Sequence, residues 1–221
     1  MPLQLKKYEV VLPDEVSLAL VITGGTGPHD QRHTGFLVKD LMGGCRLFHL
    51  GGNNRYMESS FTPRYHYLLI PRLEPEVEMP IIGFLYYLMK ATKGRIAYSV
   101  VWSDDESFDG EGLPITADAS DGFTCATFVL ETLRRYAFDL VDRSTWPLTT
   151  ADAVWQRGIL DVAELSSEQF LAQVEKVGKF PRFRPEHALG AAHYYTGDKL
   201  PFSIVSPAGD EVVQEMGRLS V

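Results

Sequence analysis

The sequence lacks the features that mark several common classes of protein. It has only two cysteines in 221 residues, whereas disulfide frameworks use more cysteines in shorter chains. No segment approaches the roughly 18 apolar residues of a membrane span, and charges occupy the N-terminal stretch where a signal peptide needs an apolar run. The 21 Lys and Arg are outnumbered by 29 Asp and Glu, which argues against a phosphate-backbone binder. We therefore expect no integral membrane segment, no nucleic-acid partner, and a protein that is cytoplasmic or exported without a classical signal peptide.

Length and composition predict one domain. The chain is 45% hydrophobic, and 221 residues are enough to bury one sizeable core. We expect a single domain over residues 1–221, with a catalytic core at about 17–138 and a helical C-terminal extension at about 149–221. No internal repeat or low-complexity linker interrupts it.

Negative charge is concentrated in one segment. The formal net charge is −8, and seven carboxylates lie between Asp104 and Asp121 without any Lys or Arg among them. Such a group of like charges cannot be buried without partners. The segment is therefore predicted to be a mobile, solvated loop whose field favours substrates that carry amines or other basic groups.

Runs typical of strands come first along the chain, and amphipathic helical stretches follow. Branched and aromatic residues bounded by Gly, Pro or Asp predict strands at 17–22, 34–38, 46–50, 65–70 and 95–102. Helical periodicity predicts a short helix at 80–91 that begins at Pro80, and further helices at 125–138, 150–163, 167–177 and 185–195. This order indicates an α+β fold in which an antiparallel sheet packs against helices.

Cys125 is the strongest candidate for a chemical role. It follows the turn-like stretch 121–124 and occupies the first turn of the helix predicted at 125–138. Free backbone N–H groups and the helix dipole stabilise a thiolate at that point, so we expect a depressed pKa and a nucleophilic sulfur. On the predicted helix it shares a face with Val129, Leu133 and Tyr136, and the thiol would therefore point toward the sheet.

Two histidines are placed to serve this thiol. His33 directly precedes one predicted strand, and His49 lies within the next. We expect His33 to take the thiol proton as general base and to return it to the leaving group, while His49 orients the His33 ring. The N–H of Cys125 would donate to the oxyanion. His66 is the alternative to His49, and the sequence identifies no second oxyanion donor.

This order of residues resembles the circularly permuted branch of the papain-like NlpC/P60 superfamily, which includes lecithin:retinol acyltransferase-like and H-rev107-like thiol enzymes. In that branch a strand-opening His and a second His in a short apolar strand precede an Asn-Cys-Glu-His-Phe-Val type motif. Thr124-Cys125-Ala126-Thr127-Phe128-Val129 is similar to that motif, and Phe48-His49-Leu50 is similar to the second strand. The resemblance spans roughly His33 to Phe138 and implies a papain-like sheet packed against a nucleophile-bearing helix, with additional C-terminal helices.

The resemblance implies a cysteine hydrolase. Thr124 replaces the usual Asn, Ala126-Thr127 replace Glu-His, and the chain lacks the apolar C-terminal anchor of many of the lipid enzymes. We therefore expect a peptidase or amidase that acts on peptides or on peptidoglycan stem peptides. A thiol acyltransferase or lipase acting on lipid esters, and a binding module that has lost catalysis, are the alternatives. In a bacterium, a leaderless enzyme of this kind could be a toxin delivered by a specialised secretion machine, with a cognate inhibitor protein as partner.

Other motifs give weaker signals. Asp105, Ser107 and Asp109 are spaced like the start of a calcium loop, but Thr116 stands at the twelfth position where Glu is needed. A zinc site made by Cys45, His49, Cys125 and His33 would lack a closely spaced ligand pair. We expect no metal and no cofactor.

Three further features are predicted to be structural. Gly24-Gly25-Thr26-Gly27 is not followed by Gly-Lys-Ser/Thr and is predicted to be a turn instead of a phosphate loop. His187 and His193 are six residues apart on one predicted helix and do not share a face. We expect both to be structural or surface residues.

Overall fold

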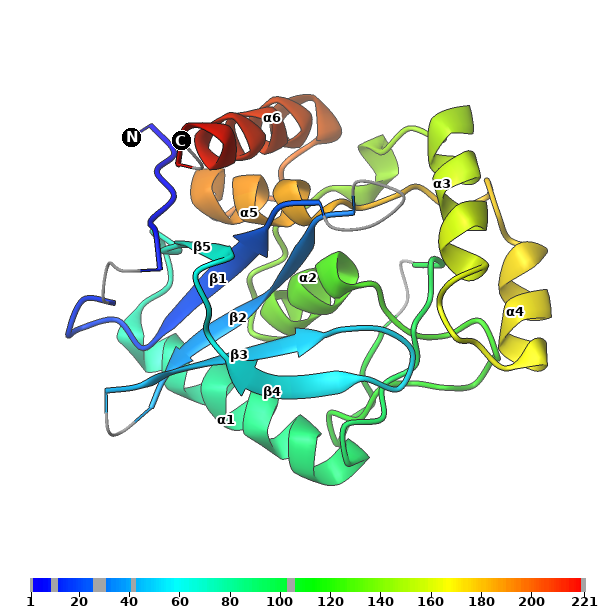
Figure 1. Ribbon diagram of the computed structural model, residues 1–221, viewed down its shortest axis with the longest axis horizontal. Coiled ribbons are helices and arrows are strands. Elements are labelled where there is room, and N and C mark those ends of the chain that lie inside the picture. Colours follow the sequence, from blue (N-terminus) through cyan, green and yellow to red (C-terminus); the bar gives the residue numbers. More distant parts are fainter. Residues whose placement is uncertain (1, 9–11, 26–30, 41–42, 103–105, 220–221) are drawn as a thin grey trace.

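The structure is a computed structural model that describes residues 2–8, 12–25, 31–40, 43–102 and 106–219. Within these ranges the fold is α+β, with one five-stranded sheet and six α-helices (Figure 1). The strands are β1 (Leu18–Thr23), β2 (His33–Lys39), β3 (Cys45–Leu50), β4 (Tyr56–Ser60) and β5 (Tyr65–Leu68). The helices are α1 (Pro75–Thr92), α2 (Cys125–Arg135), α3 (Thr150–Leu160), α4 (Ser167–Val174), α5 (Pro185–Tyr194) and α6 (Phe202–Leu219).

The sheet has the order β4-β3-β2-β1-β5, and every neighbouring pair is antiparallel. Because side chains alternate along a strand, its two faces carry different residues. Leu20, Phe36 and Phe48 belong to the main core, whereas Val21, Leu37 and Leu47 belong to a second core on the opposite face. The strands therefore read as continuous apolar runs, since both faces are covered.

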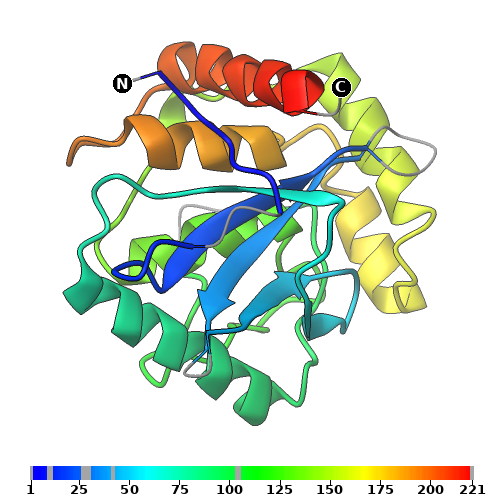
Figure 2. The same ribbon diagram turned by 60° about the vertical axis from the view of Figure 1, so that its left-hand side comes forward.

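Helices from both halves of the sequence complete the main core. Its residues come from α1, α2, α5 and α6 as well as from the sheet. Figure 2 shows α5 and α6 packed side by side on one side of the molecule, with α1 on the opposite side. A smaller core joins α3 and α4 to the extended segment that contains Tyr98 and Val100. These last two helices lie together at one end of the molecule (Figure 1).

Several predicted boundaries were wrong. The segment 95–102 is not a strand of the sheet; its bridge from Tyr98 runs to Phe123. Helix α1 begins at Pro75 and not at Pro80, because Pro75 fits the first helical turn, where a missing N–H costs nothing. Two elements were not predicted from the sequence: β4, whose alternation is weak because its residues are mostly polar, and α6, which contains Pro207.

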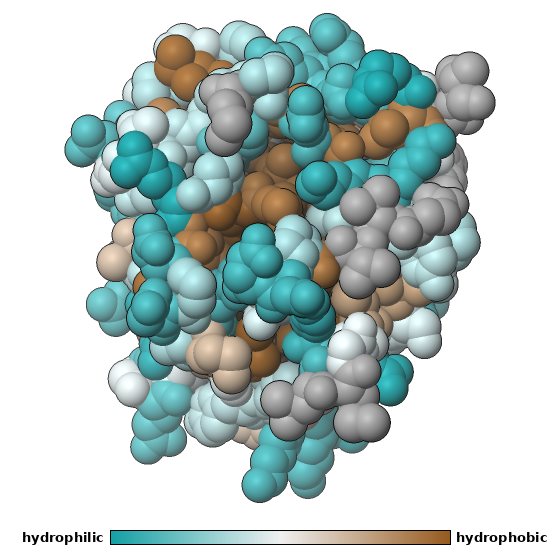
Figure 3. Space-filling view, turned by 90° about the vertical axis from the view of Figure 1, so that its left-hand side faces the viewer, coloured by the Kyte–Doolittle hydropathy of each residue, from teal (hydrophilic) through white to brown (hydrophobic). Residues whose placement is uncertain are grey.

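One side of the molecule, which carries the N-terminal segment, shows apolar side chains in a band across its middle between hydrophilic ones (Figure 3). A shallow pocket of about 340 Å³ with a mainly apolar lining is formed by residues of the N-terminal segment and of the stretch after β5, including Pro2, Leu68, Leu69 and Pro71. Among the described residues, no helix combines the length and apolar character needed to cross a membrane.

Candidate active site

Cys125 is the first residue of α2, as the sequence predicts. Thr124 is the N-cap, and its Oγ1 accepts a hydrogen bond from the N–H of Thr127 at 3.1 Å. In return, Thr127 Oγ1 accepts from the N–H of Thr124 at 2.9 Å. These two threonines form a capping box that satisfies two free donors of the helix. Because the Cys125 side chain is only 4% exposed, the cap holds a buried thiol at the positive end of α2.

The chain reaches Cys125 through a segment that is held against residues 97–99. The N–H of Phe123 donates to Ala97 O at 3.0 Å, and Phe123 O accepts from the N–H of Ser99 at 3.1 Å. Gly122 has φ +146°, and a Cβ at this position would lie 2.5 Å from Ala97 O. Only glycine tolerates this conformation and this close approach. The backbone before the thiol is therefore fixed by the hydrogen bonds of Phe123 to residues 97 and 99 and by the close packing of Gly122 against Ala97.

The structure brings the two predicted histidines into direct contact. His33 Nε2 lies 2.7 Å from His49 Nδ1. His49 Nε2 in turn lies 3.1 Å from Ser59 Oγ on β4. This chain of polar contacts runs across three neighbouring strands, β2, β3 and β4. Ser59 was not predicted, because the polar stretch Met57-Glu58-Ser59-Ser60 gave no strand signal.

Gly35 makes the contact between the histidines possible. It lies between His33 and Leu37 on the same face of β2, and the register places it opposite His49. A Cβ on Gly35 would lie 2.6 Å from Phe48 O and 2.7 Å from the Cβ of His49. The absence of a side chain therefore lets the imidazole of His49 lie across β2.

Gly35→Ala is expected to force β2 and β3 apart locally and to move His49 away from His33. Overpacking of this kind costs about 1–3 kcal/mol of stability. The midpoint temperature of thermal unfolding should fall. Gly83→Ala is the matched control, because a Cβ at Gly83 meets nothing within 4 Å in the interior of α1. That substitution should stabilise the protein by about 0.5–1 kcal/mol. A Gly35→Ala protein with unchanged stability would contradict this account of the contact.

The thiol and the imidazoles approach the end of β2 from different faces of the sheet. Helix α2 packs on the face that carries Phe36, with the rings of Phe36 and Phe128 6.3 Å apart. His33 and His49 alternate with that face and share the one that carries Leu37 and Leu47. The backbone N–H of Thr34, the residue after His33, lies beside the Cys125 sulfur and lowers its pKa. The sulfur is thus held at the residue next to His33, where the strand begins.

The expected depression of the Cys125 pKa was wrong. Burial raises the pKa of the thiol to about 11, although the N–H groups of Thr34, Ala126 and Cys125 itself oppose the rise, and the Glu186 carboxylate adds to it. Burial also lowers the pKa of His33 to about 3 and that of His49 to about 4, helped in both cases by the positive charge of Arg64. Helix position favours a thiolate, but removal from water outweighs it here. The resting site therefore contains a neutral thiol and neutral imidazoles.

Because both imidazoles are neutral, the His33–His49 and His49–Ser59 hydrogen bonds can take only two sets of directions. In one set His33 Nε2–H donates to His49 Nδ1, and His49 Nε2–H donates to Ser59 Oγ. In the other set the Ser59 hydroxyl donates to His49 Nε2, and His49 Nδ1–H donates to His33 Nε2. Only the first leaves a lone pair on His33 Nδ1, the nitrogen that a proton acceptor would use.

The structure also places two residues that the sequence analysis missed beside the thiol. The Tyr98 side chain is buried, and burial together with the nearby Cys125 sulfur raises its pKa. Glu186 from α5 is 5% exposed and lies near enough to raise the pKa of Cys125. Its Oε1 pairs with Arg32 at 3.1 Å, which ties the residue before His33 to α5. No sequence motif signals either residue, because both reach the thiol from elements that fold against it.

The other histidines lie apart from this chain of contacts. His66 is on β5 and pairs with Ile22 of β1, on the face of the sheet opposite to His33 and His49. The alternative role of His66 as the orienting residue therefore does not fit the contact that His33 makes. His187 is 6% exposed and packs against the rings of Trp146 and Phe202. These contacts with core aromatic rings indicate a structural role for His187.

The structure does not bring together the four residues considered for a zinc site, which are Cys45, His49, Cys125 and His33. Cys45 and His49 are four residues apart on β3, which separates them by about 13 Å along the strand. Within the ranges that the structure describes, no group of three or more His, Cys, Asp and Glu side chains could hold a metal ion.

The acidic segment is more organised than predicted in the part that the structure describes; Asp104 and Asp105 lie outside it. Asp109 Oδ1 accepts backbone N–H bonds from Glu111 and Leu113. Asp118 Oδ1 accepts from Ser120 and lies 3.4 Å from Lys176 Nζ. Several carboxylates therefore hold turns, and a cation from the stretch after α4 neutralises one of them.

Comparison with known proteins provides no assignment, since no family model, no curated protein and no solved structure matches this chain.

Proposed function

We propose that the protein is a papain-like cysteine hydrolase that cleaves amide bonds, with Cys125 as nucleophile, His33 as general base and His49 as the residue that orients His33. The observation that carries this proposal is the 2.7 Å contact between His33 Nε2 and His49 Nδ1, together with the position of the Cys125 sulfur beside the N–H of Thr34. One ring nitrogen of His33 is used by His49. The other, Nδ1, would take the thiol proton at the start of β2, which His33 and Cys125 approach from opposite faces of the sheet.

The neutral resting site favours concerted general-base catalysis over a preformed ion pair. As the Cys125 sulfur attacks the substrate carbonyl, its proton passes to His33 Nδ1. The resulting imidazolium keeps its Nε2–H bond to His49, which is backed by Ser59. His33 then gives the proton to the leaving amine, and a thioester remains on Cys125. Water, activated by His33, hydrolyses the thioester and restores the thiol.

Two groups are suited to stabilise the tetrahedral oxyanion. The backbone N–H of Cys125 lies at the N-terminus of α2, where it has no partner within the helix. The Tyr98 hydroxyl lies near the same sulfur, and its raised pKa keeps it a hydrogen-bond donor. We assign Tyr98 as the second donor of the oxyanion site. Tyr98→Phe should then lower turnover while leaving acylation of Cys125 detectable.

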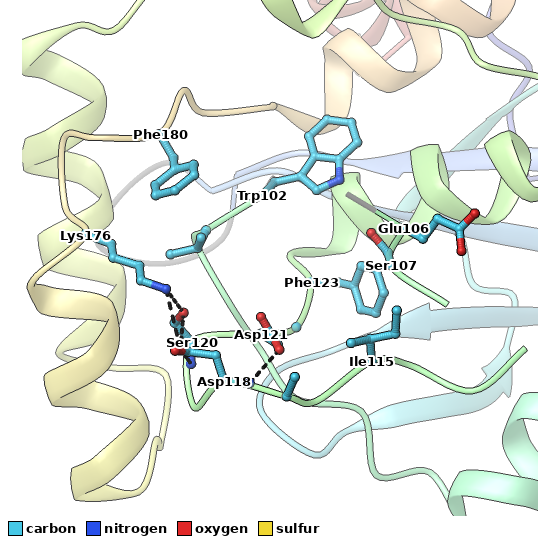
Figure 4. A pocket seen from close by; sticks show the side chains of 13 residues that line it. Trp102, Glu106, Ser107, Ile115, Asp118, Ser120, Asp121, Phe123, Lys176 and Phe180 are labelled. Atoms are coloured by element: carbon cyan, nitrogen blue, oxygen red, sulfur yellow. Dashed lines mark hydrogen bonds and ion pairs between the residues drawn. The ribbon is translucent and has the colours of Figure 1, made fainter. Parts of the chain in front are cut away.

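The arrangement of elements supports the papain-like assignment and the substrate class. An antiparallel sheet carries the two histidines on adjacent strands, and the nucleophile begins a buried helix that packs on the same sheet. The resemblance to permuted NlpC/P60 proteins implies a sheet packed against a nucleophile-bearing helix; here the two histidines lie on the face of that sheet opposite to the helix. Carboxylates line a pocket beside the chain segment that leads into α2 (Figure 4), which favours a peptide or a peptidoglycan stem peptide over a lipid ester. The proposal rests on the site, since the fold alone would permit several chemistries.

Exposure to p-nitrophenyl acetate tests the thiol chemistry without a known natural substrate. We expect a burst of p-nitrophenol and an acetyl thioester on Cys125, detected by peptide mass spectrometry. Iodoacetamide at neutral pH should instead modify Cys45 first, because Cys45 is half-exposed and Cys125 is buried and protonated. Cys45→Ser should keep the burst, whereas His33→Ala should lose it. Acetylation of Cys45 and lysines without acetylation of Cys125 would refute the assignment.

A further inference from the structure

Helix α1 has an outer face that combines exposed apolar side chains with a charge near each end. Figure 2 shows α1 at the periphery of the molecule, on the side opposite to α5 and α6. Met79 is 58% exposed, Tyr86 40% and Tyr87 41%. A contiguous group of large apolar side chains on a surface marks an interaction site, whereas scattered single ones do not. The outer face of α1 consists of Glu76, Met79, Gly83, Tyr86, Tyr87 and Lys90.

The residues of this face are ordered symmetrically about Gly83. Because an α-helix turns by about 100° per residue, all six lie within about 60° of a line through Gly83. Met79 and Tyr87 are four residues before and after Gly83, and Glu76 and Lys90 are seven residues before and after it. This spacing is that of the seam along which two helices pair. The face therefore carries an acidic end, an apolar middle and a basic end.

Gly83 has no contact within the chain that requires a glycine. A Cβ at this position would meet nothing within 4 Å, and the backbone there is ordinary helix. Glycine in the interior of a helix lowers its stability relative to alanine. What a glycine on an exposed helix face provides is room for another backbone to come close. The centre of the outer face of α1 is thus shaped for contact with another helix.

A second copy of α1 that runs antiparallel matches this face. With a two-fold axis at Gly83, Lys90 of the partner subunit lies level with Glu76, and Tyr87 of the partner subunit lies level with Met79. Each contact occurs twice, because a two-fold interface is self-complementary. Within the part of the chain that the structure describes, neither Glu76 nor Lys90 forms an ion pair, so both charges are available to a partner.

We propose that the outer face of α1 binds a second copy of this chain, through an antiparallel pair of α1 helices centred on Gly83. The charges set the direction, since a parallel pair would place Glu76 against Glu76 and Lys90 against Lys90. The Tyr86 ring is held by an edge contact with Phe48 at 4.7 Å between centroids, so it loses little freedom on association. The inference is independent of the proposed hydrolase function.

Sedimentation equilibrium of the full chain over a concentration series at low salt tests this pairing. We expect a reversible dimer. Gly83→Ala should weaken it by about 10-fold or more, because two methyl groups would meet at the axis, yet it should raise the unfolding temperature of the dilute monomer. Gly217→Ala is the matched control, since Gly217 is a glycine of α6 whose Cβ would also meet nothing within 4 Å. A monomer at millimolar concentration, or equal effects of the two substitutions on association, would overturn the proposal.

Opposite charge variants test the antiparallel direction. Glu76→Lys makes both ends of the face basic, and Lys90→Glu makes both ends acidic. At low salt each variant alone should dimerise about 3–10-fold more weakly than wild type. An equimolar mixture of the two should recover the wild-type affinity, because opposite charges then meet at both ends. Failure of the mixture to recover would refute the antiparallel pair. Thermal unfolding of the dilute variants measures the separate effect of each charge on the helix dipole.

Loss of an aromatic side chain distinguishes this face from other surfaces and other occupants. Tyr87→Ser should weaken the dimer, whereas Leu171→Ser, which removes an exposed apolar side chain from α4, should not. Equal dimerisation of wild type and Tyr87→Ser would place the contact elsewhere and overturn the proposal. Monomeric wild type that co-sediments with phosphatidylcholine and phosphatidylserine vesicles in a Tyr87-dependent manner would make the face a lipid-binding surface and overturn it as well.

Discussion

Cys125→Ala is expected to reduce amide hydrolysis to the background rate while the fold stays intact, because the substitution deletes the atom that forms the thioester. His33→Ala should lower kcat by about 10²–10⁴-fold, which is the usual contribution of a general base. His49→Ala should cost less, since it removes the group that sets the His33 tautomer but leaves the base and the nucleophile. The measurements are kcat and KM on peptide amides, with thermal unfolding as a test of folding.

Two controls make this result specific. Cys45→Ala removes the other thiol, which lies at the far end of β3, and should leave turnover unchanged. The pH profile provides the second control. Because burial lowers the pKa of His33 to about 3, activity should persist well below pH 6.5 instead of falling there. Full activity of a purified His33→Ala protein would show that the base is another residue.

His187→Leu is expected to make the protein markedly more resistant to acid. In the folded chain, burial and the nearby Arg184 and Arg182 lower the pKa of His187 to about 4 from the ordinary value of 6.5. Between these two values the unfolded state binds more protons than the folded state, so the free energy of unfolding falls as the pH falls. The loss approaches about 1.4 kcal/mol per pH unit for one such group. Leucine cannot be protonated and removes this dependence.

The comparison of wild type and His187→Leu across pH isolates the effect. At pH 7 the variant should be at least as stable as wild type, since His187 Nδ1 is buried without a hydrogen-bond partner among the described residues. Urea unfolding at pH 7, 6, 5 and 4.5 should show a difference that widens toward acid. Other groups titrate equally in both proteins and cancel in the difference. A constant difference across this range would mean that His187 does not carry the acid sensitivity.

The parts of the molecule that depend on local sequence were predicted well. The apolar runs of β1, β2, β3 and β5 and the helix start at Cys125 each reside in a few consecutive residues. The placement of His33 and His49 on adjacent strands followed from the same signals. Whether the two histidines act as base and orienting residue stays a prediction.

The predictions that were wrong, and the residues that were missed, depend on burial and on contacts between residues distant in sequence. The helix terminus correctly suggested stabilisation of a thiolate, but the sequence could not show that the thiol would lie so far from water that its pKa rises. Ser59, Tyr98 and Glu186 reach the site from three separate elements, and none has a motif of its own. The acidic segment looked unpaired in sequence because its cation, Lys176, is supplied from 58 residues further along the chain.

The chain of contacts that ends at Ser59 ends on the outermost strand of the sheet. β4 has only five residues and pairs with β3 on one side, so it belongs to the part of a sheet that opens most readily. When β4 frays, His49 loses the hydroxyl that holds its Nε2, while the core between the sheet and α2 can remain closed. The order of the two imidazoles therefore depends on a local opening equilibrium, and warming would release them before the domain unfolds.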